Sequence, residues 1–227
     1  MSEIARPPAV RRVAVVGASG KTGVQLVEEA LARGWEVAAV CREGSAGKLD
    51  AYRSVPGFTR FTGPQVSDPQ TLRRALEGCD AAAAILMSVR GLRATDMVRA
   101  MQQVADAGGP RHVVFTSGEV TFVPEADERF TFRQRLLSVF AQLVTALSPY
   151  SVSDMLRASR RVRDHDWQWT AVRAPTLYDG EPAGYVRCAL SDIDAKHRLT
   201  RRDYAAALLD ALDDPQAVRR AVTVRPT

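Results

Sequence analysis

The residues with the clearest potential for chemistry form a glycine-rich segment near the amino terminus. The sequence Val13-Ala-Val-Val-Gly17-Ala-Ser-Gly20-Lys-Thr-Gly23 runs from an apolar stretch into glycines spaced three apart, and an amphipathic stretch follows. Glycines allow a tight turn and a close approach of the backbone to a pyrophosphate. The start of the following helix would attract the phosphates through its N–H groups and dipole. The pattern predicts a dinucleotide site; the alternative is a tight strand-to-helix turn that binds nothing.

A second candidate lies at the end of the next apolar stretch, which reads Val40-Cys41-Arg42. A site for NAD would place an acidic residue there to hold the ribose hydroxyls. The guanidinium of Arg42 can instead hold a 2′-phosphate through two hydrogen bonds, and Lys21 adds a second cation nearby. We therefore expect NADP rather than NAD. A solvated charge at the strand end is the alternative for Arg42, and Glu43 could serve a free ribose instead.

Side chains for proton transfer, metal binding and disulfides are scarce in the 227 residues. No two Cys or His residues have the spacing of metal ligands, so no metal site is expected. Three widely spaced cysteines give no disulfide framework, and we expect a cytoplasmic protein. The lysines, histidines and cysteines are Lys21, Lys48, Lys196, His112, His165, His197, Cys41, Cys79 and Cys188.

The composition excludes several classes of protein. A hydrophobic content of 46% supports a substantial core and argues against general disorder. The formal net charge of +5 is modest, and the basic residues are scattered without a DNA-binding or RNA-binding pattern. No apolar run is long enough to span a bilayer. We expect a small-molecule substrate, with no nucleic acid or membrane as partner.

Short apolar runs alternate with amphipathic stretches along the chain, which predicts an α/β fold with a doubly wound parallel sheet of the Rossmann type. We expect one domain over residues 1–227, with 1–10 as a flexible lead-in and 175–195 as a small lobe that covers the substrate. The loop 42–48 is expected to be irregular. The strands expected are 13–16, 35–41, 58–62, 79–87, 112–116, 168–172 and 221–224. The helices expected are 21–33, 69–77, 95–107 and 202–212, with a mostly helical region over 128–164.

Two side-chain stripes occur at helical spacing in the region 128–164. The residues Phe132, Leu136, Phe140, Leu143 and Leu147 form an apolar stripe that predicts core packing or an apolar wall over the substrate pocket. A self-association face is an alternative, so the oligomeric state is left open between monomer and homodimer. The second stripe, Arg157, Arg160 and Arg161, predicts a solvated face, and the alternative is attraction of an anionic substrate.

Four segments together resemble the atypical short-chain dehydrogenase/reductases, and more narrowly the NAD(P)H-binding group of NmrA-like proteins and flavin/biliverdin-IXβ reductases. The segments are Val13–Gly23 with its helix, Val37–Arg42, His112–Ser117, and Trp169–Pro175 followed by Leu177–Gly180. The glycine segment is the specific one. The resemblance implies a Rossmann fold with NADP lying across the strand ends.

The resemblance also implies which residues bind the cofactor. Those implied for the pyrophosphate are Gly17, Ser19, Gly20, Lys21, Thr22 and Gly23. Arg42 would hold the 2′-phosphate. Leu86, Met87 and Ser88 would line the middle of the cofactor, while Thr116, Arg173 and Pro175 would border the nicotinamide.

The usual reductase dyad of a tyrosine and a lysine four residues later is missing. No lysine occurs between Lys48 and Lys196, so the pair cannot form in the expected region. The remaining candidates for catalysis are Ser117, which follows a strand, and Tyr178, which lies in a later loop. Turn closure by Ser117 and simple packing by Tyr178 are the alternatives.

The leading hypothesis is an NADPH-dependent reductase of a conjugated or aromatic small molecule, such as a flavin, a quinone or a biosynthetic intermediate. Hydride would pass directly, with positioning supplying most of the catalysis. Two alternatives keep the fold. One is a non-redox isomerase, cyclase or coupling enzyme of biosynthesis, and the other is an NmrA-like regulatory protein that senses NADP.

Overall fold

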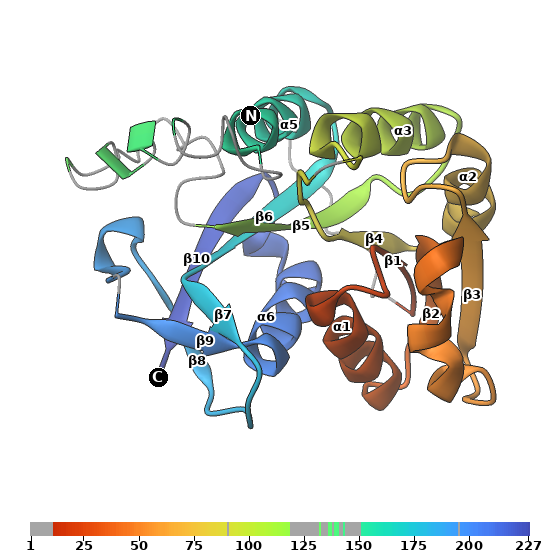
Figure 1. The fold of residues 1–227 in the computed structure, drawn as a ribbon, viewed down its shortest axis with the longest axis horizontal. Helices are drawn as coiled ribbons and strands as arrows, with labels where there is room; N and C mark the ends of the chain where they lie inside the picture. The colour runs from red at the N-terminus through yellow and green to blue at the C-terminus, as the bar shows by residue number, and fades with distance from the viewer. Residues whose placement is uncertain are drawn as a thin grey trace.

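The fold consists of a central sheet between two layers of helices (Figure 1). It is seen in a computed structural model that describes residues 11–89, 91–118, 132, 136–137, 139–140, 143, 151–194 and 196–227. The expectation for residues 1–10 lies outside these residues. In sheet order, the eight strands are β3 (Phe58–Gly63), β2 (Glu36–Arg42), β1 (Arg12–Val16), β4 (Ala81–Ala84), β5 (His112–Gly118), β6 (Gln168–Ala174), β10 (Arg220–Pro226) and β8 (Tyr185–Cys188).

The order of the strands confirms the predicted Rossmann-type sheet. The six strands β3-β2-β1-β4-β5-β6 are all parallel. Their order in the sheet runs outward in one direction from β1 to β3 and in the opposite direction from β4 to β6, so the order reverses between β1 and β4. In open α/β sheets, ligands bind outside the carboxyl ends of the strands at such a reversal. Beyond β6, β10 is parallel to its neighbour and β8 is antiparallel to β10. The site is therefore expected where β1, β4 and β5 end.

Among the described residues, five α-helices cover the two faces of the sheet. One face packs against α1 (Lys21–Ala32) and α6 (Arg201–Asp213), and the other packs against α2 (Pro69–Leu76), α3 (Ala94–Asp106) and α5 (Val152–Asp164). Strand residues alternate between the two apolar cores; Ala14 and Val16 face the α3 side, while Val13 and Val15 face the α1 side. Covering both faces explains why the strands are short and almost wholly apolar.

The segment expected as a lobe, 175–195, contributes to two sheets. β8 extends the edge of the main sheet. β7 (Thr176–Tyr178) pairs in parallel with β9 (Arg198–Thr200) to form a separate two-stranded sheet. The short 3-10 helix η2 (Leu190–Asp192) lies within the segment, and a further one, η3 (Pro215–Ala217), follows α6. That the segment covers a substrate stays a prediction.

Three local expectations are wrong. The segment 42–48 is not irregular, since the 3-10 helix η1 (Glu43–Tyr52) occupies it and buries Leu49. The strand expected over 79–87 is only Ala81–Ala84. Past its end, the N–H of Leu86 donates to the side-chain hydroxyl of Thr116 in the neighbouring strand β5, and not to a backbone carbonyl of that strand. The expectation that the apolar stripe packs in the core is also wrong. Helical spacing determines which side chains share a face of a helix, but it does not determine what covers that face. Its members Phe132, Leu136, Phe140 and Leu143 are 61% to 83% exposed, and Leu147 lies outside the described residues.

In the part of the chain that the structure describes, no helix combines the length and apolar character needed to cross a bilayer.

His112 at the start of β5 predicts a pH-dependent stability. It is 3% exposed, and neither ring nitrogen has a hydrogen-bond partner among the described residues. Burial lowers its pKa from 6.5 to about 4. Between these values the unfolded chain binds the proton and the folded chain does not, so stability falls as the pH falls. We expect a loss of about 2 kcal/mol in the free energy of unfolding between pH 7 and pH 4.5.

Denaturant unfolding across this pH range, compared between the native chain and His112→Leu, measures the contribution. The variant should lose most of the decline above pH 4.5, because leucine cannot bind the proton. His197→Gln is the matched control and should keep the decline. An equally steep decline in His112→Leu would show that other groups cause it.

Candidate dinucleotide site

The glycine segment forms the predicted turn between β1 and α1. Gly17 has a φ of +91°, a conformation that residues with a side chain rarely adopt. Its N–H and that of Ala18 both donate to the carbonyl of Val40 at 3.0 Å, which fixes the loop to the end of β2. A Cβ on Gly23 would lie 2.2 Å from the carbonyl oxygen of Gly17. The loop therefore packs on α1 at a distance that only glycine permits.

The amino terminus of α1 is suited to an anion. Gly20 is its N-cap residue and supplies no side-chain cap. The first N–H groups of a helix lack partners within the helix, and the helix dipole adds positive charge there. A pyrophosphate would satisfy those groups, as predicted for the loop from Gly17 to Gly23.

Arg42 lies at the end of β2, next to this loop. Its side chain is exposed, and among the described residues no ion pair involves it. Its carbonyl accepts a hydrogen bond from the Ser45 hydroxyl at 3.2 Å, and the hydroxyls of Ser45 and Ser19 lie 2.8 Å apart. By contrast, Arg60 of β3 is held by the carboxylate of Asp50 at 2.6 Å. Arg42 is therefore the guanidinium here that is available to a phosphate.

Lys21 has an acidic partner that the sequence did not indicate. Its ammonium group lies 3.5 Å from a carboxylate oxygen of Asp179, which follows β7. The other oxygen of Asp179 accepts a hydrogen bond from Arg201 at 2.7 Å, at the start of α6. These contacts connect the loop after β7 to the first turns of α1 and α6. Lys21 thus lies at the predicted position but shares its charge with Asp179.

A pocket of about 170 Å³ opens beside the glycine loop, where β4, β5 and β6 end. The Thr116 hydroxyl accepts a hydrogen bond from the N–H of Leu86 at 2.9 Å, which joins the ends of β4 and β5. No charged side chain occurs among the described residues that line this pocket. The lining residues are Thr22, Ile85, Leu86, Met87, Thr116, Ser117, Gly118, Met155, Ala174, Pro175, Leu177 and Tyr204.

Tyr204 of α6 is a pocket residue that we did not predict from the sequence. It is 1% exposed, and its hydroxyl accepts a hydrogen bond from the N–H of Ser117 at 2.9 Å and donates one to the carbonyl of Val172 at 2.7 Å. Tyr204 thereby connects the carboxyl ends of β5 and β6. Burial raises the pKa of Tyr204, so the hydroxyl keeps its proton. The sequence signal for Tyr204 was a tyrosine, with its polar hydroxyl, on an otherwise apolar face of the helix.

Comparison with protein families identifies the family of this chain. Residues 17–215 match the NAD(P)H-binding family, from the first glycine of the loop to just beyond the end of α6. The chain belongs to this NAD(P)H-binding family. No curated protein matches it by sequence.

Solved structures share the NAD(P)H-binding fold. A short-chain dehydrogenase/reductase from Veillonella parvula is 17% identical, with a TM-score of 0.75 and coverage of 95% of this chain and 94% of that one. Its complex with NADP has 18% identity, a TM-score of 0.71 and the same coverage. ChuY, an anaerobilin reductase from Escherichia coli O157:H7, has 20% identity, a TM-score of 0.71, and coverage of 94% and 96%. At these identities the likeness shows the fold alone.

Of the site residues predicted outside the glycine loop and Arg42, three lie apart from the pocket lining of this NAD(P)H-binding chain. The hydroxyl of Ser88 donates a hydrogen bond to Asp154 and accepts one from the N–H of Ala94, so it is already engaged both as a donor and as an acceptor. Arg173 is fully buried within β6, beside Ser117 in the register of the sheet. Tyr178 is half-buried, with the guanidinium of Arg198 5.2 Å from its ring centre. Roles for these side chains in binding or catalysis stay predictions.

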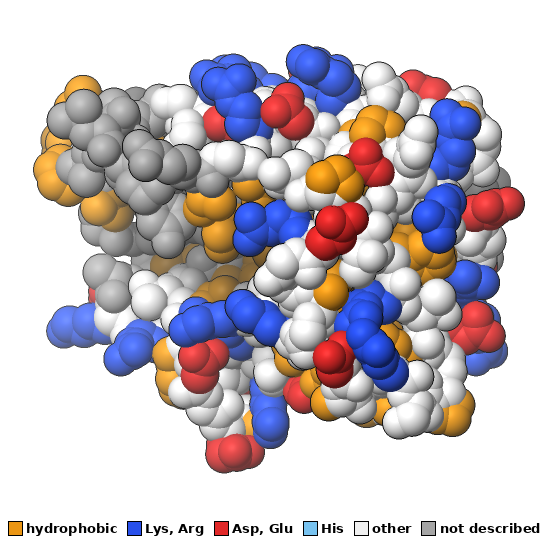
Figure 2. Space-filling view, turned by 45° about the vertical axis from the view of Figure 1, so that its right-hand side comes forward, with side chains coloured by type: hydrophobic (Ala, Val, Ile, Leu, Met, Phe, Trp, Pro, Cys, Tyr) orange, Lys and Arg blue, Asp and Glu red, His pale blue; other side chains and the backbone are white. Residues whose placement is uncertain are grey.

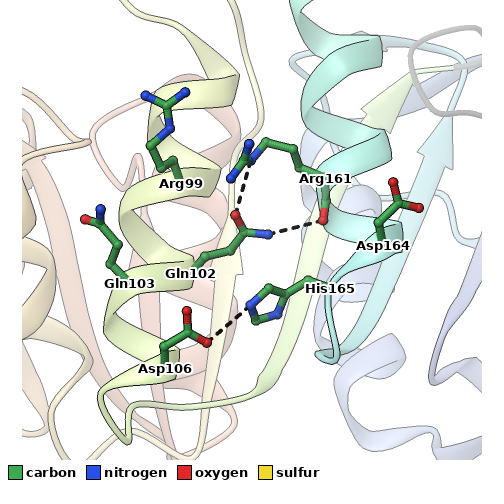
Figure 3. Close-up of a pocket in the computed structure, with 7 residues that line it drawn as sticks. All are labelled: Arg99, Gln102, Gln103, Asp106, Arg161, Asp164 and His165. Atoms are coloured by element: carbon green, nitrogen blue, oxygen red, sulfur yellow. Dashed lines mark hydrogen bonds and ion pairs between the residues drawn. The ribbon is translucent and has the colours of Figure 1, made fainter.

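A larger cavity of about 600 Å³ lies between α3 and α5, away from the strand ends (Figure 3). Its lining is mostly charged or amide side chains. Gln102 accepts a hydrogen bond from Arg161 and donates one to the Arg161 carbonyl, both at 3.2 Å, while His165 lies 3.4 Å from Asp106. These groups satisfy one another across the two helices. Despite its size, this cavity lacks the glycine loop and strand ends that a dinucleotide requires.

Proposed function

We propose that the chain is an NADPH-dependent reductase of a conjugated or aromatic small molecule, such as a flavin, a quinone or a biosynthetic intermediate. The observation that carries this proposal is an uncharged, largely apolar pocket at the strand ends, directly beside a tightly packed glycine loop of the kind that suits a dinucleotide. A nicotinamide extending from the loop across the ends of β4 and β5 would reach this pocket.

The choice of NADPH rests on the available guanidinium of Arg42. An exposed arginine at the end of β2 supports binding of a 2′-phosphate, and the NADP complex of the Veillonella parvula protein is in keeping with that choice. The net charge of +5 would also attract an anionic cofactor. Figure 2 shows a hollow with hydrophobic side chains on its floor and basic side chains along part of its rim.

The nature of the acceptor follows from the pocket lining. Met87 and Met155 present thioethers, which pack well against flat aromatic rings. Bound NADPH would supply the hydride, Met87 and Met155 would hold a conjugated acceptor able to take it up directly, and Ser117 or water would supply the balancing proton. No tyrosine–lysine pair is needed for this transfer. The name of ChuY, an anaerobilin reductase, fits a conjugated acceptor.

Calorimetric titration with NADPH and NADH, followed by assays of NADPH oxidation with flavin and quinone acceptors, tests the proposal. We expect tighter binding of NADPH than of NADH and stoichiometric loss of NADPH absorbance as the acceptor is reduced. Conversion of a compound without consumption of NADPH would replace the proposal with a non-redox enzyme. NADP binding without turnover of any acceptor would favour a regulatory protein that senses NADP.

We also infer a cytoplasmic location for the reductase. The three cysteines are all free, and a reducing compartment keeps thiols in that state.

A further inference from the structure

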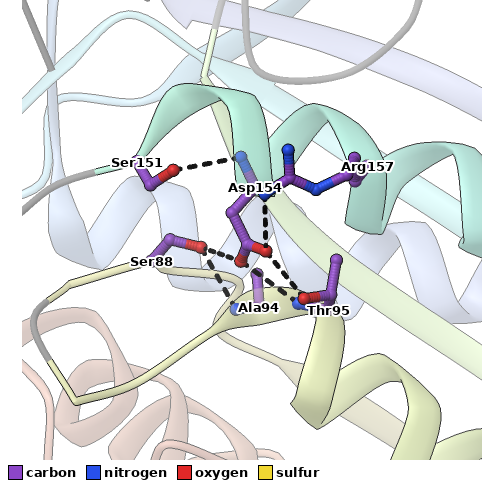
Figure 4. A network of polar contacts seen from close by, with 6 residues as sticks. All are labelled: Ser88, Ala94, Thr95, Ser151, Asp154 and Arg157. Atoms are coloured by element: carbon purple, nitrogen blue, oxygen red, sulfur yellow. Dashed lines mark hydrogen bonds and ion pairs between the residues drawn. The ribbon is translucent and has the colours of Figure 1, made fainter. Parts of the chain in front are cut away.

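A buried carboxylate, Asp154, lies at the centre of a polar network between α5, the loop after β4 and the start of α3 (Figure 4). Asp154 belongs to the first turn of α5 and is 2% exposed. One carboxylate oxygen accepts a hydrogen bond from the Ser88 hydroxyl at 2.5 Å. The other accepts one from the Thr95 hydroxyl at 2.7 Å. The carboxylate therefore connects α5 to the loop after β4 and to α3.

The same carboxylate completes the start of α3. The N-cap residue of α3, Arg93, supplies no side-chain hydrogen bond. The first two N–H groups of the helix are satisfied from outside it, since the N–H of Ala94 donates to the Ser88 hydroxyl at 3.1 Å and that of Thr95 donates to Asp154 at 3.3 Å. Negative charge is favourable at this end of a helix. Asp154 thus performs the capping role for α3 from a different helix.

The connected elements are two walls of the pocket. The residues before Ser88, Leu86 and Met87, line one wall, and Met155, the residue after Asp154, lines another. The carbonyl of Ser88 also accepts a hydrogen bond from the N–H of Ser151 at 3.1 Å, so the loop is held to α5 through backbone as well. A shift of Asp154 relative to Ser88 would change the distance between Met87 and Met155.

Asp154 keeps its charge in this position. Burial alone would raise its pKa, but the hydrogen bonds from Ser88 and Thr95 and the nearby charge of Arg157 outweigh burial, and the pKa of Asp154 lies below its usual value. Arg157 is 3.4 Å away and half exposed. An ionised carboxylate accepts hydrogen bonds at both oxygens, whereas an amide offers one acceptor and brings two donors. An asparagine could still accept from Ser88 and the Thr95 N–H, but its amide NH2 could not accept from the Thr95 hydroxyl and would face the Arg157 guanidinium.

We propose that Asp154 is a positioning residue that sets the separation of the Met87 and Met155 walls and so determines how a flat acceptor fits against the nicotinamide. This inference rests on the proposed reductase function for its effect on catalysis. Its effect on the pocket walls does not depend on turnover, so the two can be tested separately.

The first test follows the walls themselves in protein labelled with ¹³C at the methionine methyl groups. The chain has only five methionines, so each signal can be assigned by substitution. In Asp154→Asn, we expect the Met87 and Met155 signals to shift. Asp164→Asn, at the exposed end of the same helix, is the control and should leave both in place. Unchanged Met87 and Met155 signals in folded Asp154→Asn would overturn the inference.

The second test measures catalysis well below the unfolding temperature. Asp154→Asn should raise the KM for a quinone or flavin acceptor by roughly 10-fold while changing the Kd of NADPH by less than about 3-fold, because the glycine loop and Arg42 are untouched.

If Asp154→Asn does not fold, Ser88→Ala and Thr95→Val each remove one donor and should shift the same two methyl signals. A lower unfolding temperature with an unchanged KM would mean that Asp154 acts on stability alone and would overturn the positioning role. A native chain that never oxidises NADPH would overturn the reductase proposal, while the methyl signals would still decide the role of Asp154.

Discussion

Gly23→Ala is expected to weaken NADPH binding by about 100-fold or more. The new Cβ would lie 2.2 Å from the Gly17 carbonyl oxygen and 2.8 Å from backbone atoms of Ala18. All of these are main-chain atoms, so no side chain can turn away to relieve the contact. Either α1 moves outward or the loop moves toward the cofactor, and both displace the N–H groups that would hold the pyrophosphate.

Calorimetric titration with NADPH measures this loss, and Gly44→Ala provides the matched control. A Cβ on Gly44 would meet nothing within 4 Å, and Gly44 does not have a positive φ. The control should therefore bind NADPH as the native chain does. Circular dichroism would show whether Gly23→Ala keeps its secondary structure. Binding by a folded Gly23→Ala within about 3-fold of the native value would refute the assigned role of the loop.

The sheet could be predicted from the sequence because periodicity and length carry strong information about buried strands. Runs such as Val13–Val16 and His112–Thr116 are apolar on both faces, which indicates a parallel sheet covered by helices, and the structure has β1 and β5 there. The prediction was weaker where few residues are buried. Of the ten residues of η1, only Leu49 is buried, so the segment has no periodic apolar signal.

The glycine loop could be predicted because its chemistry is local, whereas several contacts of the site come from residues distant in the chain. Tyr204 and Ser117 are 87 residues apart, and Lys21 and Asp179 are 158 apart. Their meeting depends on how α6 and the loop after β7 dock on the sheet, and no spacing pattern in the sequence records that docking. Ser88 shows the opposite problem, since the family resemblance implies a cofactor role for it, whereas its hydroxyl is bound to Asp154.

We expect the choice between the two nicotinamide cofactors to depend mainly on the end of β2. Arg42 is exposed and has no ion pair among the described residues, while the neighbouring Arg60 is held by Asp50 and by the carbonyl of Ala46. Only the guanidinium of Arg42 is then available for two hydrogen bonds to a 2′-phosphate. Hydrogen bonds of this charged kind contribute about 1.5–3 kcal/mol when they form. NADH lacks the phosphate and gains nothing from them.

Arg42→Ala should therefore raise the Kd of NADPH by about 10- to 100-fold and leave the Kd of NADH within about 3-fold of its native value. Titration of both cofactors against both proteins measures the change in preference. Arg53→Ala is the control, because it removes the same charge from an arginine that is paired with Asp50. If Arg53→Ala weakens NADPH binding as much as Arg42→Ala does, general attraction by positive charge explains the preference. Parallel losses for NADPH and NADH in Arg42→Ala would instead show that the guanidinium acts on a part common to both cofactors, such as the ribose or the pyrophosphate.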